Sequence, residues 1–233
     1  MYDQIVDAIK EAPLFAGMST KEIKVLITSC NVIDRKKGFL FSQKALDRSL
    51  FIPLNGAVKS YQINPVTSKE YILFLFTSGQ IFDVITFVDE RQHEVLFETV
   101  EDTRLLEIPH RQMNRWIEEN PQINKNLIYL LSGMLQNLEQ NASDLALYDT
   151  VTRLARLIFR NLPGTQLLSQ SDSEKVKLKL LSLSHENIAQ MIGSVREVVS
   201  RSMKTLKNEQ VIETDAKKRR LIDLRSLLDF IKK

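Results

Sequence analysis

The stretch 184–204 constrains the fold most, because its pattern fits two short helices joined by a tight turn. Gly193 separates the two apolar patterns, and glycine adopts the positive φ of such a turn without steric cost. Ser184 stands where the first helix would begin, and serine is a favoured N-cap residue. The stretch therefore predicts a helix-turn-helix unit with one buried side, formed by Ile188, Ala189, Ile192, Val195, Val198, Val199 and Met203.

The second helix of this unit carries a polar face opposite its apolar one. Arginine can donate two hydrogen bonds to guanine and glutamate can accept one from cytosine, so such a face suits the DNA major groove. A solvated helical hairpin on a protein surface would show the same pattern, so the motif needs support from the rest of the chain. The side chains that we expect to read bases are Arg196, Glu197, Ser200 and Arg201.

The charge of the chain is distributed unevenly. Residues 1–149 hold 15 Lys/Arg and 20 Asp/Glu, whereas residues 150–233 hold 17 and 9. A basic part that contains the helix-turn-helix pattern fits a polyanionic partner. Short strand-like segments at 211–213 and 221–224 flank a basic run, which predicts a two-stranded wing with a basic tip suited to phosphate contacts. The side chains expected on the DNA backbone are Ser184, His185, Lys204, Lys217, Lys218, Arg219 and Arg220.

The N-terminal half has a different texture. Helical patterns in residues 2–29 break at Pro13 and Gly17 and restart after Ser19. Residues 31–108 then form short apolar runs separated by turn residues, of which Asn55-Gly56 is the clearest. Several short strands at regular spacing indicate a β-sandwich or a barrel-like roll.

A long helix is expected after Pro121, with apolar residues spaced alternately by three and four positions. This spacing is the heptad pattern of a coiled-coil seam, which would hold two copies of the chain together. Two to three heptads are short, so a helix that packs only on its own domain is the alternative. The seam consists of Ile128, Leu131, Leu135, Leu138, Ala142 and Leu145.

The composition excludes several classes of protein. The single cysteine, Cys30, forms no internal disulfide and cannot alone hold an iron–sulfur cluster, so we expect a small buried apolar side chain. No catalytic motif is present, which predicts that the chain is not an enzyme, and no metal site is expected. The chain shows neither a signal peptide nor a run of 18 apolar residues, so we expect a soluble, cytoplasmic protein.

The order of these parts resembles that of the Crp/Fnr family of bacterial transcription regulators. The most specific match is Ile192-Gly-Ser-Val-Arg-Glu-Val-Val-Ser-Arg201, which is similar to the family's recognition-helix signature. The resemblance covers nearly the whole chain and implies an α+β fold. It has a jelly-roll, cyclic-nucleotide-binding-like sensor domain over residues 1–120, a dimerisation helix and hinge over 121–149, and a winged helix-turn-helix DNA-binding domain over 150–233.

The resemblance also implies how the DNA would be read. The family residues that match Arg196, Glu197 and Arg201 read G·C pairs in half-sites of the TGTGA type, and Ser200 matches the serine of the Fnr branch, whose half-sites are of the TTGAT type. A homodimer on a palindrome with TGA-containing half-sites is therefore expected. Asp149 matches the aspartate that caps the first helix of the DNA domain at the hinge, and RNA polymerase is the partner that the family implies.

The effector is where the chain departs from the family. Members that bind cyclic AMP use a Gly-Glu-Leu turn and an Arg-Ser-Ala segment, whereas this chain has Ile81–Val84 and Gln92–Val95 at the matching places. Glu94 would bring a negative charge near the phosphate, so we expect an effector other than cyclic AMP, or none. The residues of the candidate effector pocket are Phe82, Asp83, Arg91, His93 and Leu138.

Haem is the one cofactor that stays open, because His93 could serve as an axial ligand, although a solvated loop histidine is the simpler interpretation. The phenylalanines of this region fit either a plain core or a pocket for an apolar effector. The alternative function is a signalling module that binds haem or a small molecule and has weak DNA binding without sequence preference.

Overall fold

The computed structural model describes residues 2–10, 12–162, 179–215, 218–221 and 223–232. Within them the chain divides into two compact units, residues 1–138 and 139–233. The boundary between the units falls inside the long helix that we expected after Pro121. Each unit has its own core, and each is described by itself below.

The N-terminal unit begins with helices α1 (Tyr2–Lys10), η1 (Pro13–Phe15) and α2 (Thr20–Ile27). The predicted restart at Ser19 is confirmed, because the Ser19 hydroxyl accepts a hydrogen bond from the Glu22 N–H while the Glu22 carboxylate accepts one from the Ser19 N–H. This reciprocal pair is a capping box. These helices share an apolar core with α5 (His110–Glu119), and Trp116 lies buried at its centre.

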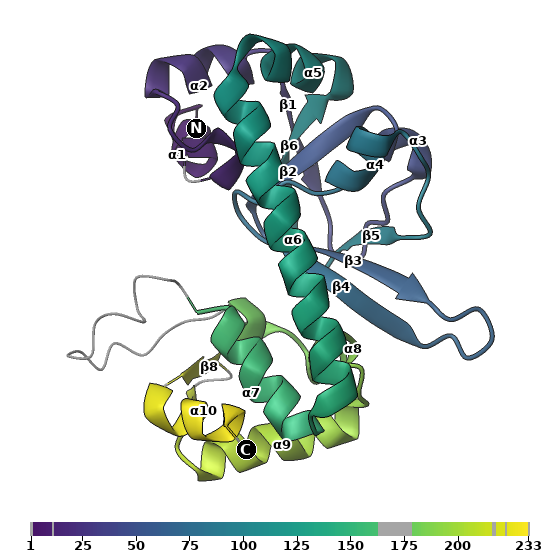
Figure 1. Cartoon of the computed structure of the whole chain (residues 1–233), viewed down its shortest axis with the longest axis vertical. Helices are drawn as coiled ribbons and strands as arrows, with labels where there is room; N and C mark the ends of the chain where they lie inside the picture. The colour runs from purple at the N-terminus through teal and green to yellow at the C-terminus, as the bar shows by residue number, and fades with distance from the viewer. Residues whose placement is uncertain (1, 11, 163–178, 216–217, 222, 233) are drawn as a thin grey trace. The chain divides into compact units, whose positions relative to one another are not determined.

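Two three-stranded antiparallel sheets follow, as the spacing of short apolar runs predicted. One sheet has the order β1-β6-β2 and the other β4-β3-β5. Asn55-Gly56 connects the two sheets rather than closing a hairpin, with Gly56 at a φ of 80°. Figure 1 shows both sheets in the same unit as α1, α2 and α5. The strands are β1 (Asn31–Arg35), β2 (Ser49–Asn55), β3 (Val58–Ile63), β4 (Glu70–Phe76), β5 (Leu96–Thr99) and β6 (Thr103–Pro109).

Two short helices interrupt the strands of this region. They are α3 (Gln43–Leu46) and α4 (Val84–Asp89). The apolar run 39–41 is not a strand of either sheet and contributes one isolated bridge, from Leu40 to Glu98. Cys30 is half-buried against the N-terminal core, and burial raises the pKa of its thiol to about 12, so the thiol stays protonated at neutral pH.

The long helix α6 (Pro121–Leu147) follows α5 and begins with proline at its first position, where the missing N–H costs nothing. It runs for 27 residues and contains all the positions of the predicted heptad seam, 128–145. None of the helices in the described part of the chain is both long and apolar enough to cross a membrane.

The C-terminal unit contains the end of α6, then α7 (Thr150–Arg160), η3 (Lys179–Ser182), α8 (His185–Met191) and α9 (Arg196–Asn208). It ends with the strands β7 (Ile212–Asp215) and β8 (Lys218–Leu221) and the helix α10 (Leu224–Ile231). Helix α7 contacts both α9 and α10, and Figure 1 shows these three helices together. The residues between 162 and 179 lie outside the described part of the chain.

Candidate nucleic-acid interface

The helix-turn-helix forms as the sequence predicted. The Ser184 hydroxyl accepts a hydrogen bond from the Asn187 N–H at 3.1 Å and so caps α8. Gly193 has a φ of 62° in the turn, and the Ser194 N–H closes that turn on the Ala189 carbonyl at 2.9 Å. The turn therefore ends α8 and sets the start of α9.

The apolar side of the unit is buried except at Val195, which is exposed, and at Val198, which is half-buried. Ile188, Ala189 and Ile192 of α8 and its turn are buried, and Val199 and Met203 are buried on α9. Val195 is 52% exposed because it is the extended N-cap of α9 rather than a residue within the helix. Leu206 is the further apolar residue that completes the buried side, one turn after Met203.

The predicted base-reading side chains lie together on the opposite side of α9. Arg196, Glu197, Ser200 and Arg201 are all exposed. Their positions i, i+1, i+4 and i+5 place them on one face of a helix. Lys204 is exposed one turn further along α9. The structure thus presents two guanidinium groups, one carboxylate and one hydroxyl on a single helical face.

A recess lies at the N-terminal ends of α8 and α9. It has a volume of about 460 Å³ and is lined by Ser184, His185, Glu186 and Arg196. His185 is the first residue of α8, as expected from its place after the Ser184 cap. Helix N-termini expose N–H groups that bind anions. The part of this recess that Arg196 lines therefore suits a phosphate group.

The predicted wing exists, but three of its four predicted cations lie in a strand rather than at the tip. Strand β7 pairs antiparallel with β8, and Asp215 is opposite Lys218. Lys218, Arg219 and Arg220 therefore belong to a strand and not to the tip, because the ladder extends as far as residue 218. Lys217 lies outside the described residues, as do the side chains of 218–220. The segment 221–224 was expected to be a strand, but only Leu221 belongs to β8, and Leu224 begins α10.

The turn of the helix-turn-helix is fastened to two neighbouring elements. The Arg153 guanidinium of α7 donates to the Ile192 carbonyl at 2.8 Å and to the Thr150 hydroxyl at 3.2 Å. A Cβ atom placed on Gly193 would lie 2.5 Å from a methyl carbon of Leu145, so the Leu145 side chain occupies that space. Sequence reasoning gave Arg153 no role, because its partner is a carbonyl 39 residues away.

The helix α7 begins where the sequence predicted. The Asp149 carboxylate accepts a hydrogen bond from the Thr152 N–H at 2.8 Å, and this bond holds the pKa of Asp149 below its usual range. Helix α7 is thus capped by an ionised aspartate. Because α6 ends at Leu147, only two residues connect the helices.

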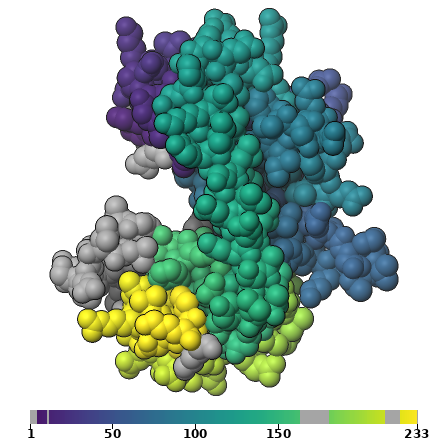
Figure 2. All heavy atoms as spheres, viewed as in Figure 1, coloured from purple at the N-terminus to yellow at the C-terminus, as the bar shows by residue number. Residues whose placement is uncertain are grey.

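The predicted seam is largely uncovered within one chain. Ile128 and Leu135 are 61% and 59% exposed, and Ala142 is also exposed. Leu131 is half-buried because it also packs against the N-terminal core. Helix α6 lies at the surface of the face drawn in Figure 2. A row of exposed apolar side chains along one helix is typical of an interaction surface.

The interior of the β-roll in the N-terminal unit is filled by aromatic rings. Phe82 is fully buried, and its ring centroid lies 5.2 Å from that of Phe41, 5.5 Å from Phe51 and 5.3 Å from Phe97. Helix α6 contributes Met134 to the same cluster. Phe82 therefore belongs to a packed core, which is the first of the two interpretations that the sequence left open.

Asp83 lies beside this core in an unusual state. It is 7% exposed and has a φ of 62°, a conformation that aspartate tolerates better than most residues. One carboxylate oxygen accepts the Thr86 hydroxyl at 2.7 Å, and the other has no partner among the described residues. Burial raises the pKa of Asp83 to about 6. A buried carboxylate at this place disfavours a second anion nearby.

The other predicted effector residues do not converge on that core. His93 is exposed, and its Nε2 atom lies 3.3 Å from an Asp89 carboxylate oxygen. Arg91 is exposed, and its main-chain N–H donates a hydrogen bond to the Asp89 carboxylate at 3.0 Å. Leu138 is half-buried at the last position of the N-terminal unit. No cluster of three or more His, Cys, Asp or Glu able to hold a metal occurs in the described part of the chain.

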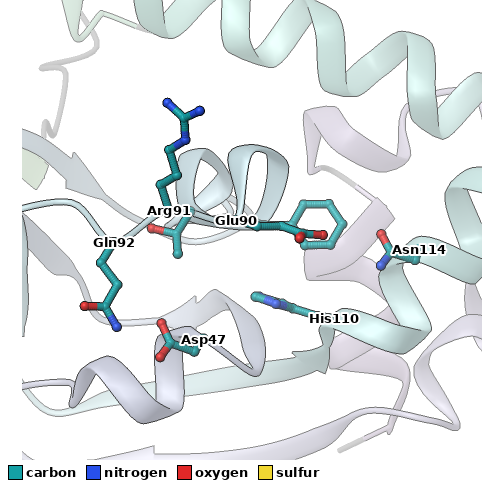
Figure 3. A pocket seen from close by; sticks show the side chains of 8 residues that line it. Asp47, Glu90, Arg91, Gln92, His110 and Asn114 are labelled. Atoms are coloured by element: carbon teal, nitrogen blue, oxygen red, sulfur yellow. The ribbon is translucent and has the colours of Figure 1, made fainter.

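A cavity of about 350 Å³ lies between α3, α4 and α5 (Figure 3). Of the five predicted effector residues, only Arg91 lines it, and in Figure 3 the Arg91 side chain points away from His110. His110 begins α5 without capping it, since Pro109 is the N-cap residue. Its ring stands edge-on to Phe87, and burial lowers the pKa of His110. The lining residues are Asp47, Thr86, Phe87, Glu90, Arg91, Gln92, His110 and Asn114.

Comparisons with known proteins agree with this architecture. Residues 35–120 match the family model of the cyclic nucleotide-binding domain, and residues 152–230 match that of the Crp-like helix-turn-helix domain. The two matched ranges coincide with the roll and α5 on one side, and with the helix-turn-helix and wing on the other.

Two relatives share low sequence identity with most of this chain. The chain is 22% identical over 198 residues to a CRP-like cAMP-activated global transcriptional regulator of Mycobacterium tuberculosis, covering 84% of this chain and 86% of the relative. It is 27% identical over 212 residues to the global nitrogen regulator of a Nostoc species, covering 89% and 90%.

Solved structures share the fold. A CooA mutant from Carboxydothermus hydrogenoformans matches with a TM-score of 0.70 at 22% identity, covering 89% of this chain and 90% of that one. FixK2 from Bradyrhizobium japonicum matches with a TM-score of 0.71 at 15% identity, covering 86% and 96%. The chain, with its cyclic nucleotide-binding domain followed by a Crp-like helix-turn-helix, belongs to the Crp/Fnr family of DNA-binding transcription regulators.

Proposed function

We propose that the protein is a homodimer that binds a palindromic DNA site with TGA-containing half-sites and recruits RNA polymerase in the cytoplasm of a bacterium. The observation that carries this proposal is the exposed face of α9. This face consists of exposed side chains on a helix whose other side is buried. They are Arg196, Glu197, Ser200 and Arg201. A helix held in this way can enter the major groove without losing its packing.

The remaining contacts would position the protein on the DNA backbone. Lys204 and the recess at Ser184 and His185 flank the base-reading face, and β8 carries three further cations. Phosphate contacts fix register and orientation but carry no sequence information, so these residues serve affinity more than specificity. Fluorescence anisotropy with a palindromic TGA duplex and a scrambled duplex tests the proposal, and we expect about 10³-fold tighter binding to the palindrome.

Dimerisation through α6 predicts a specific sensitivity to charge. We expect Leu135→Glu to convert the dimer to a monomer, because it places a carboxylate in an apolar seam. Binding to a palindrome should then weaken by about 10²-fold, since the second half-site is no longer reached by the same molecule. Light scattering coupled to size-exclusion chromatography gives the mass. Gln136→Glu, which adds the same charge at the next exposed position outside the seam, is the matched control. A Leu135→Glu variant that stays dimeric would contradict the assignment.

The sensor domain supports an effector other than cyclic AMP, or none. By the resemblance, the nucleotide phosphate would lie near Ile81–Val84 and Gln92–Val95, where this chain has buried Asp83 and the exposed carboxylate of Glu94. The interior of the roll is filled by Phe41, Phe51, Phe82 and Phe97. Both the negative charge and the filled interior disfavour a cyclic nucleotide at this place.

We therefore expect cyclic AMP to leave the protein unchanged. Titration with cyclic AMP up to about 1 mM, which reaches even weak sites of about 4 kcal/mol, should release no binding heat. It should also leave the affinity for the palindrome the same within error. An increase in DNA affinity on addition of cyclic AMP would contradict this prediction, since a ligand shifts a two-state protein only by binding one state better.

A haem- or small-molecule-binding module with weak DNA binding is the alternative function. His93 is the residue that favours it, because it is an exposed histidine on the loop after α4. Its imidazole already lies against Asp89, which supports the simpler interpretation of a solvated loop histidine. An absorption spectrum of protein expressed with added haem separates the two, because a Soret band that disappears in His93→Ala would establish the haem protein.

A further inference from the structure

Asp144, near the end of α6, forms a buried ionic cluster with two arginines of α7. The Asp144 side chain is 5% exposed. One of its carboxylate oxygens accepts the Arg156 Nε–H at 2.5 Å, and the other accepts an Nη1–H of Arg160. Both oxygens of one carboxylate are thus used to fasten α6 to α7.

Two more side chains extend this cluster along the end of α6. The Arg160 Nη2 group donates to the Asn141 amide oxygen at 2.8 Å. The Arg156 guanidinium lies 4.5 Å from the centre of the Tyr148 ring, within the range of a cation–π interaction. Three side chains therefore contact α7: Asn141 and Asp144 within α6, and Tyr148 just after the end of α6.

The C-terminal end of α6 also contacts the helix-turn-helix. Leu145 occupies the space that a Cβ atom on Gly193 would need, in the turn between α8 and α9. The Arg153 guanidinium of α7 donates a hydrogen bond to the Ile192 carbonyl of that turn. Leu145 is in addition the last position of the seam. A seam residue, the ionic cluster and the helix-turn-helix turn are therefore linked by direct contacts within the C-terminal unit.

We propose that Asp144 is a positioning residue, which locks the last two turns of α6 to the helix-turn-helix and so fixes how far apart a dimer holds its two recognition helices. This inference rests on the proposed function, because it requires a homodimer on two half-sites. The connection between α6 and α7 at Asp149 is then held in one arrangement, by the Asp144 cluster and by the contact of Leu145 with the turn at Gly193.

Stability alone does not explain such a cluster. Removing three charged groups from water is costly, and well-packed apolar residues of similar size often stabilise a fold as well or better. An ionic cluster in which each carboxylate oxygen has its own donor instead admits one arrangement of the two helices. A dimer that must place two helices about one DNA turn apart needs that single arrangement.

The experiment compares three kinds of DNA duplex with the full-length protein. The first carries the palindrome, the second carries one intact and one scrambled half-site, and the third set varies the half-site spacing by one to three base pairs. We expect Asp144→Asn to weaken binding to the palindrome about tenfold, because effective concentration falls when the geometry no longer matches. Binding to the single half-site should change less than about twofold, and the spacing preference should broaden, since each head still reads its bases.

Two further variants keep the result interpretable. Asp34→Asn is the matched control, because Asp34 forms a similar two-pronged pair with Arg104 that is exposed. Tyr148→Leu removes only the ring against Arg156, and it decides the question if Asp144→Asn does not fold. Equal losses on palindrome and half-site, or an unchanged spacing preference, would overturn the positioning role. A wild-type protein that does not distinguish palindrome from scrambled DNA would instead overturn the proposed function.

Discussion

Arg201→Ala is expected to weaken binding to the specific palindrome by about 1–3 kcal/mol, which is about 5- to 150-fold, while binding to random DNA changes little. The Arg201 side chain is exposed on the free face of α9, one turn after Glu197. A guanidinium that donates two hydrogen bonds to guanine loses both on truncation, and no other group replaces them. Discrimination at one base pair of each half-site should relax accordingly.

Lys204→Ala provides the matched control for this prediction. Lys204 is exposed on the same helix, one turn further on, where we expect a phosphate contact. Its loss should weaken specific and random DNA to the same extent and reduce the salt dependence of binding by about one released counterion. Competition binding with single-base variants of the palindrome measures both effects. Equal losses on specific and random DNA for Arg201→Ala would contradict its base-reading role.

Gly193→Ala should destabilise the C-terminal unit by about 2–5 kcal/mol and abolish specific DNA binding. The φ of 62° costs a residue with a Cβ about 1–2 kcal/mol. The new methyl group would also lie 2.5 Å from a carbon of Leu145, and such overpacking costs about 1–3 kcal/mol. Relief of the contact would move Leu145 or the turn, and with it the start of α9.

Gly133→Ala is the matched substitution, because a Cβ at Gly133 in α6 meets nothing within 4 Å. Replacing a glycine by alanine inside a helix stabilises it by about 0.5–1 kcal/mol. Denaturant unfolding should therefore give shifts of opposite sign for the two variants. Shifts of the same sign would mean that the Gly193 turn is not the constraint described here.

Local features of the fold were predictable from the sequence because their signals are local. Ser184 and Ser19 cap helices through N–H groups three residues away, and Gly193 supplies a backbone conformation that few other residues adopt. The seam of α6 and the polar face of α9 follow from helical periodicity alone. The cysteine count and the charge division likewise required no structure.

Features that depend on distant partners were not predictable. Asp144 meets arginines 12 and 16 residues away, and Arg153 meets a carbonyl 39 residues away. Residues 179–182 lie in a segment that alternates as a strand would, yet they form a 3₁₀ turn, and a strand needs a partner that the alternation does not supply. The pairing of β7 with β8 draws the wing cations into a strand, which depends on register and not on composition.

The candidate effector site in the N-terminal unit was also not predictable from the sequence alone. Closely spaced phenylalanines fit a core and an apolar pocket equally well, and only the ring distances around Phe82 decide for the core. The cavity beside His110 combines residues from α3, α4 and α5, which no single stretch of sequence indicates. Its lining carries charges of both signs.

In vitro selection from random DNA with the purified protein, free of added ligand, tests the central claim most directly. The account predicts enrichment of a palindrome whose TGA-containing half-sites are centred about 10 base pairs apart, which is one helical turn. Enrichment of a single, non-repeated motif would contradict a homodimer that reads two half-sites.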